Sequence, residues 1–215
     1  MFSTKSYKTI LYAVIPSFAF YVIILALASS SDIPPELVLR DPGQIYGTEK
    51  LPEISLGLIS NIGILLWAAS TSICLFSLLF GLTKYSKYRK ILSLGFFLSL
   101  TLCLDDFFLI HDRHQLNQDI LYLTYPILAV ILILKLRNQS RQYSVNSLLL
   151  SFIFLGLSVF TDIFQDFFPL RYESMQIIEE GFKFIGIFTW LYFWSYFSSF
   201  AIIKNFKENV SEFYL

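Results

Sequence analysis

The sequence predicts an all-α membrane protein, a six-transmembrane-helix bundle with its N- and C-termini cytoplasmic. Hydrophobic residues make up 55% of the 215 residues and charged residues only 15%, against about 25% charged residues in an average soluble chain. The 23 Phe, 13 Tyr and 3 Trp are more than one small soluble core would absorb. The apolar residues also gather into six long windows, so the excess lies in discrete segments rather than along the whole chain.

Each window has about the 20 mostly apolar residues that a helix needs to cross a bilayer. The fourth is the shortest and contains Pro126, which favours a tilt or kink there. The only long predicted loop, residues 30–54, carries four prolines and the turn signal Asp41-Pro42-Gly43. We expect a single transmembrane domain over residues 1–215. The six windows are approximately residues 9–29, 55–82, 91–111, 120–136, 146–168 and 177–203.

The distribution of Lys and Arg predicts the orientation of the bundle. Most of the 16 basic residues fall in segments that would lie inside if the N-terminus were cytoplasmic, as the positive-inside rule requires. The first window also resembles a secretory signal, because Lys5 and Lys8 precede an apolar run that ends in Ala26-Leu27-Ala28. The run is longer than usual for a signal, so we expect a retained anchor. Cleavage would leave five spans.

Charge and cysteine content exclude some classes of function. The formal net charge is zero, so there is no basic surplus to attract nucleic acid, and membrane lipids are the expected partners. Cys74 and Cys103 lie in apolar runs, and neither has a second cysteine at a metal-ligand spacing. We interpret both as packing residues.

The third window ends in acidic residues, in the run from Leu104 to Asp112. A carboxylate at the centre of a spanning helix costs about 2.5–3.5 kcal/mol on insertion scales, and it usually faces a bundle interior, a partner or a hydrated cavity. On a helix that continues to residue 112, Asp105 and Asp112 share one face, two turns apart. Asp106 is displaced from Asp105 by about 100°, and His111 lies on the opposite flank.

The fifth window contains a second acidic pair, Asp162 and Asp166, with Gln165 beside it. On a helix these two carboxylates are i, i+4 neighbours, and like charges at that spacing repel. The sequence therefore predicts a cation, a shared proton or a basic partner near them.

The sixth and second windows bring further polar residues to the same predicted leaflet. Glu179 and Lys183 have the favourable i, i+4 orientation, and Glu180 is three residues from the same lysine. Acids at the start of this helix also favour its dipole, which is a structural explanation for them. Ser60 and Asn61 lie near the outer end of the second window, where such residues often form hydrogen bonds between helices.

Together these residues predict an acidic polar site in the outer half of the bilayer. The alternative interpretation is that helix ends near the interface simply carry charge. The candidate catalytic residues are Asp105, Asp106, Asp162 and Lys183; the candidate ligands of a divalent metal of unknown identity are Asp106, His111, Asp162 and Glu180; and the other candidate polar residues are Ser60, Asn61, Asp112, Asp166 and Glu179.

The acidic segments of the third, fifth and sixth windows together resemble uncharacterised bacterial polytopic integral membrane proteins, over most of residues 50–200. A fainter resemblance is to the ceramidase and adiponectin-receptor group of membrane hydrolases, which build a zinc site from a Ser-Asn pair, acids and a late His pair. Here Ser60-Asn61 matches loosely, whereas Glu179-Glu180 stands where the late His pair would be. The first resemblance implies a bacterial inner membrane location.

Three functions are compatible with these patterns. The first is a metal-dependent hydrolase of a lipid amide or ester, in which a metal-bound water attacks the carbonyl. The second is a proton-coupled small-molecule transporter, with intramembrane acids and Lys183 as a proton relay. The third is a non-enzymatic membrane subunit or assembly factor. The sequence alone does not select among them.

Overall fold

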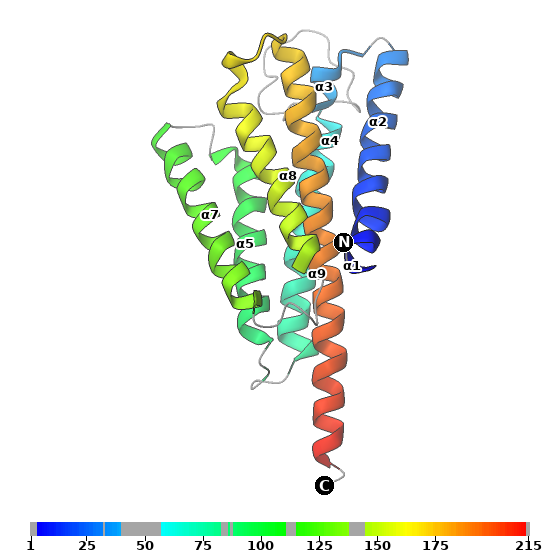
Figure 1. Ribbon diagram of the computed structural model, residues 1–215, viewed down its shortest axis with the longest axis vertical. Helices are drawn as coiled ribbons and strands as arrows, with labels where there is room; N and C mark the ends of the chain where they lie inside the picture. The colour runs from blue at the N-terminus through cyan, green and yellow to red at the C-terminus, as the bar shows by residue number, and fades with distance from the viewer. Residues whose placement is uncertain are drawn as a thin grey trace. The chain divides into compact units, whose positions relative to one another are not determined.

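The computed structural model describes residues 4–31, 33–39, 57–82, 86, 88–110, 115–137 and 145–213. Every regular element in these ranges is helical (Figure 1). Five helical segments of the described chain have the length and apolar composition needed to cross a membrane. These segments are Tyr7–Ser30, Leu58–Gly81, Arg89–Phe108, Val145–Ile163 and Tyr172–Lys207.

The all-helical prediction is therefore confirmed, and the exact number of spans stays a prediction. The fourth predicted window corresponds to α7 (Gln115–Arg137), which contains Pro126. Its apolar part within the described residues, Leu123–Leu136, is shorter than the other candidate spans. The sides on which the termini lie also stay a prediction. Of the predicted loop, α3 (Pro35–Leu39) is described, and residues 40–56 lie outside the described chain.

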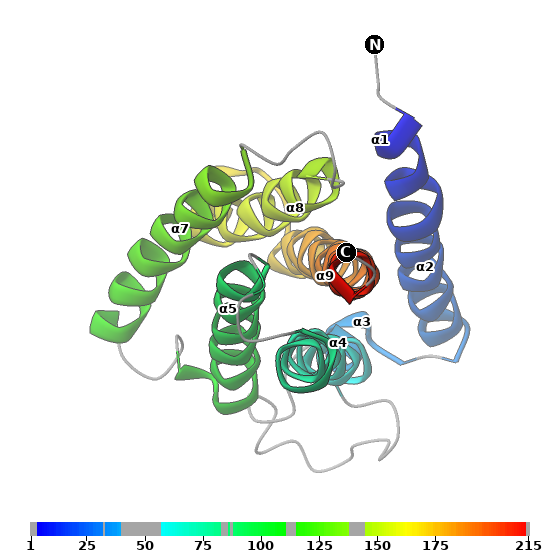
Figure 2. The same cartoon turned by 90° about the horizontal axis from the view of Figure 1, so that it is seen from below.

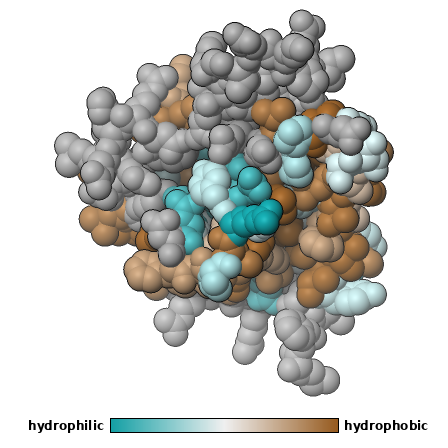
Figure 3. Space-filling view, turned by 90° about the horizontal axis from the view of Figure 1, so that it is seen from above, coloured by the Kyte–Doolittle hydropathy of each residue, from teal (hydrophilic) through white to brown (hydrophobic). Residues whose placement is uncertain are grey.

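Large apolar side chains lie exposed along the candidate spans. On α2 (Ile15–Ser30), for example, Phe18, Ile23 and Leu27 are each more than half exposed. The view from above shows hydrophobic surface beside hydrophilic residues (Figure 3). Soluble monomers rarely expose large contiguous apolar patches, whereas a helix that faces lipid has no reason to bury them. The exposed surfaces therefore agree with the spanning lengths.

The chain divides into two compact units. The first unit contains Met1–Leu66 and Asn146–Trp190, and the second contains Trp67–Val145 and Leu191–Leu215. Two helices, α4 (Leu58–Phe76) and α9 (Tyr172–Phe213), contribute residues to both.

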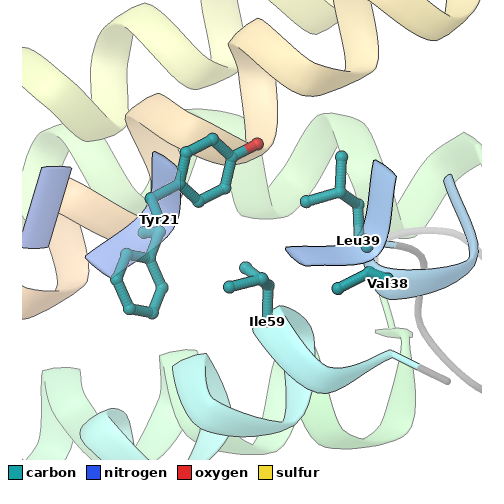
Figure 4. Packing of buried hydrophobic residues seen from close by; sticks show 6 residues of the cluster. Tyr21, Val38, Leu39 and Ile59 are labelled. Atoms are coloured by element: carbon teal, nitrogen blue, oxygen red, sulfur yellow. The ribbon is translucent and has the colours of Figure 1, made fainter. Parts of the chain in front are cut away.

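The first unit has an apolar core to which α2, α3, α4 and α9 each contribute (Figure 4). Tyr21 of α2 packs its ring against Phe184 of α9, with 6.1 Å between the ring centroids. Gly57, just before α4, has a φ of 60°, a conformation that glycine adopts without strain, and its N–H donates to the Leu37 carbonyl oxygen of α3. The core cluster consists of Tyr21, Ala28, Val38, Leu39, Ile59 and Phe184.

The start of the first candidate span changes its helical form before a proline. α1 (Thr4–Thr9) passes into a π-helical turn, η1 (Ile10–Val14), and then into α2, whose second residue is Pro16. Proline lacks an N–H, and its ring crowds the carbonyl one turn earlier. A wider π turn at this point relieves that crowding, and the helix continues to Ser30.

A close approach between α8 (Val145–Ile163) and α9 completes the first unit. Ser151 Oγ donates a hydrogen bond to the Gly186 carbonyl oxygen at 2.8 Å. A Cβ atom on Gly186 would lie 2.8 Å from Leu155 Cγ, so the glycine makes this approach possible. Small residues and a hydroxyl bond are a common way for helices to pack in lipid.

The second unit contains α5 (Arg89–Phe108), α7, the end of α4 with its π-helical turn η3 (Ser77–Gly81), and the C-terminal part of α9. α5 and α7 lie side by side (Figure 2). The α9 side of the core is aromatic, because Phe193, Trp194 and Phe197 are fully buried. Phe193 stacks on Phe197 at 5.8 Å, and Tyr88 meets Phe197 edge-on.

The predicted extension of the third span to residue 111 is wrong. α5 ends at Phe108, because Leu109 adopts the left-handed conformation (φ 51°, ψ 46°) and its N–H bonds to the Asp105 carbonyl oxygen. A left-handed residue is a common way for a helix to end. The helix that would give Asp105 and Asp112 a shared face therefore ends before residue 112. His111 and Asp112 themselves lie outside the described residues.

The predicted extension of the fifth span to residue 168 is also wrong. α8 ends at Ile163, and a short 3₁₀ helix, η4 (Gln165–Phe167), follows. Phe168 is extended (φ −92°, ψ 138°), as the residue before a proline tends to be, and Pro169 follows it. Asp162 and Asp166 are therefore not i, i+4 neighbours on one α-helix.

The sixth helix is longer than its predicted window of residues 177–203. α9 begins at Tyr172 and ends at Phe213. A hydropathy window excludes polar residues at both ends, whereas the helix continues through them. The i, i+4 spacing of Glu179 and Lys183 on a helix is consequently retained.

Candidate functional site

The C-terminal turn of α5 carries two adjacent carboxylates, Asp105 and Asp106, in the second unit. Negative charge is unfavourable at this end of a helix, because the carbonyl dipoles already make it negative. The last turn of α5 contains no basic residue. Hydrogen bonds from neighbouring helices are therefore the expected source of compensation.

A hydrogen bond from α7 offsets the cost of burying the Asp105 carboxylate. Its side chain is only 5% exposed, and its Oδ2 atom accepts a hydrogen bond from the Tyr125 hydroxyl at 2.9 Å. Burial of a carboxylate without such a donor would be costly. The bond therefore joins the end of α5 to the middle of α7.

The carboxylate of Asp106 receives its hydrogen bond from α4. Its Oδ2 atom accepts a hydrogen bond from the indole N–H of Trp67 at 2.9 Å, and Trp67 is only 2% exposed. Consecutive helical residues are about 100° apart, which explains why the two carboxylates have partners on different helices. Asp105 and Asp106 thus connect α5 to two neighbours at the same level, and this arrangement is named the α5 carboxylate clamp.

The first unit has a polar group of its own around the start of α9. The Tyr21 hydroxyl donates a hydrogen bond to the Ile177 carbonyl oxygen at 2.7 Å. Glu179 and Glu180 lie near enough to interact electrostatically with this phenol. A Cβ atom on Gly181 would lie 3.1 Å from the Tyr21 ring, so the glycine makes room for the tyrosine beside the acids.

The remaining candidate residues with described side chains also belong to the first unit. Asp162, Glu179, Glu180, Lys183 and Ser60 are half-buried, and Asn61 is exposed. Each of these six takes part in an interaction with a neighbour. Because Asp162 belongs to the other unit from Asp105 and Asp106, their predicted convergence stays a prediction. The side chain of Asp166 lies outside the described residues.

The structure does not assemble the predicted metal ligands from the side chains that it describes. Among the described residues, no group of three His, Cys, Asp or Glu side chains could hold a metal ion. Of the four predicted ligands, His111 lies outside the described chain. A divalent metal therefore stays a prediction from the sequence.

Three residues that hold the acids or lie beside them were not among the candidates. Trp67 and Tyr125 bind Asp106 and Asp105, and Tyr21 lies next to the acids of α9. The position of Trp67 in the sequence could have indicated its role. Tryptophan usually lies at the membrane interface, and a buried tryptophan needs an acceptor for its N–H. Trp67 instead stands near the middle of its apolar window.

The described part of the chain has five long apolar helices with exposed apolar surfaces, and polar groups that bond between helices. These are the features of a multi-pass integral membrane protein. More particularly, the chain belongs to the family described as a domain of unknown function (DUF8692), whose model matches residues 14–197. No curated protein and no solved structure matches the chain.

Proposed function

We propose that the protein is a non-enzymatic multi-pass membrane subunit or assembly factor, in which Asp105 and Asp106 hold helices together. The observation that carries this proposal is the α5 carboxylate clamp, in which each acid accepts a hydrogen bond from a different neighbouring helix. Polar side chains that bond across helices are a known means of stabilising membrane bundles. The inner membrane of a bacterium is the proposed location.

The geometry of the clamp favours a structural role over a catalytic one. A catalytic acid or base must reach a substrate, and a metal ligand must share its ion with further ligands. Asp105 is instead buried and bonded to a tyrosine hydroxyl, and Asp106 is bonded to an indole that is itself buried. Both donors are neutral aromatic groups, which suit a fixed contact between helices.

The hydrolase and transporter hypotheses lack an equivalent supporting contact. The hydrolase needs several of the predicted ligands around one ion, and the described residues do not bring three together. The transporter needs a continuous polar path. In the second unit, the carboxylates are engaged by Trp67 and Tyr125 near one end of α5.

Element analysis of the purified protein tests this proposal. The structural role predicts that the purified protein holds no stoichiometric divalent metal, because each acid accepts a hydrogen bond from a neighbouring helix. Incubation with a chelator should leave the unfolding temperature unchanged. Stoichiometric metal that is lost in Asp106→Asn, and kept in the exposed control Glu173→Gln, would refute the structural role and support the metal site.

A further inference from the structure

We propose that the connector between α8 and α9, residues 164–171, lies in the boundary between headgroups and acyl chains and binds lipid there. The proposal goes beyond the structural role of the clamp and rests only on the multi-pass class. A connector between two spans usually extends into water and is polar. This one presents apolar side chains instead.

Exposure of the aromatic residues is the first argument. Phe167 is 81% exposed, and Phe164, Phe168 and Leu170 are also exposed to a large extent. Tyr172, the first residue of α9, continues the same surface. Side chains of this size are normally buried, and their concentration within nine residues marks an interaction surface.

Continuity with the lipid-facing side of α8 is the second argument. The Phe160 and Phe164 rings lie 4.6 Å apart, and the Phe164 and Phe167 rings 5.8 Å apart. This aromatic row begins on a candidate span, beside the exposed Ile163, and runs into the connector. The occupant that covers the side of the span therefore also meets the connector, and for a multi-pass protein that occupant is lipid.

The backbone of the connector supplies the third argument. An N–H or carbonyl group near the acyl region must find its partner inside the protein. The N–H groups of Phe164, Phe167 and Phe168 bond to carbonyl oxygens of the preceding turn, at 3.1, 3.0 and 3.3 Å. Pro169 has no N–H to satisfy. The internal pairing of these groups is compatible with a position close to the acyl chains.

The polar residues of the connector set its depth. Asp166 and Arg171 are the only charged residues between 164 and 171, and Arg171 is exposed at the start of α9. Arginine extends toward headgroups while its stem stays in apolar surroundings, and tyrosine is enriched at the same level. Arg171 and Tyr172 therefore fit the headgroup level, with the phenyl rings below it.

Spin labelling in lipid vesicles tests the proposal. A label is attached to Phe167→Cys in a Cys103→Ala background; Cys74 is fully buried and is kept. The protein is reconstituted into vesicles of phosphatidylcholine and phosphatidylglycerol. Collision rates with oxygen, which concentrates in lipid, and with a water-soluble nickel chelate are then compared. Ile153→Cys on the exposed side of α8 is the lipid control. Lys207→Cys is the aqueous control, because Lys207 is exposed and lies 35 residues after Tyr172 on α9, more than a helix needs to cross a bilayer.

The oxygen-to-nickel ratio at residue 167 should be at least about threefold above that at residue 207 and should approach that at residue 153. A ratio equal to that at residue 207 would place the connector in water and overturn the proposal. Low collision rates with both reagents would mean that another protein surface or a second copy covers the connector. That result would also overturn the proposal.

A second measurement applies if the labelled variants do not fold. Phe167→Trp is made with both cysteines intact, and its fluorescence is compared with that of the natural chain in brominated lipid. Lipid contact predicts a larger fractional quench in the variant than in the natural chain. An equal or smaller quench would overturn the proposal.

Discussion

Replacement of Gly95 by alanine should be among the most destabilising small changes in the second unit. A Cβ atom at this position would overlap ring carbons of Trp194, and Trp194 has no exposed surface. An indole ring is rigid, and the neighbouring Phe193 and Phe197 rings pack against it at 4.9 and 5.9 Å between centroids. Overpacking of a filled core costs about 1–3 kcal/mol, and we expect Gly95→Ala near the upper end.

Unfolding monitored by circular dichroism in mild detergent gives this free energy, with Gly156→Ala as a matched control. Gly156 also lies inside a spanning helix, but nothing lies within 4 Å of the position that its Cβ atom would take. Alanine favours a helix over glycine by about 1 kcal/mol, so the control should be neutral or stabilising. Equal effects of the two substitutions would contradict the packing of α5 against Trp194.

Loss of Trp67 should also have a large effect, because the residue both fills the core and compensates a carboxylate. Trp67→Ala removes a fully buried indole, a change that costs about 3–5 kcal/mol in protein cores. Trp67→Phe keeps most of the volume but leaves Asp106 without its N–H donor. Loss of one partner of a buried bond costs about 1–3 kcal/mol.

The unfolding free energies of both variants, measured in the same detergent, check this expectation. The control is Leu65→Ala on the same helix, where the side chain is largely exposed and should change stability by less than about 0.5 kcal/mol. A Trp67→Phe variant as stable as the natural protein would show that the indole N–H is dispensable.

Much of the helical architecture could be predicted because a spanning helix has a required length and composition. The place of Asp105 and Asp106 near the end of the third helix also followed from the sequence. Their need for partners followed from the cost of burying charge. Each of these conclusions depends on the length and composition of a single segment, and both can be read directly from the sequence.

The partners of the acids could not be predicted, because they depend on how helices pack. Tyr125 and Trp67 are two of many aromatic residues in the spans, and no periodicity distinguishes them from residues that face lipid. The ends of α5 and α8 were also missed. Leu109 takes a left-handed conformation that leucine rarely adopts. Pro169 favours an extended Phe168, an effect that a hydropathy window does not contain.

The central claim is that Asp106 and Trp67 stabilise the bundle through their mutual contact. A double-mutant cycle of Trp67→Phe, Asp106→Ala and the combined variant measures that contact, because the cycle isolates the energy that the two residues share. Hydrogen bonds between membrane helices have coupling energies of about 0.6 kcal/mol on average and up to about 1.7 kcal/mol, and we predict a stabilising value in this range. Additive losses, with no coupling energy, would contradict the structural role of the carboxylate clamp.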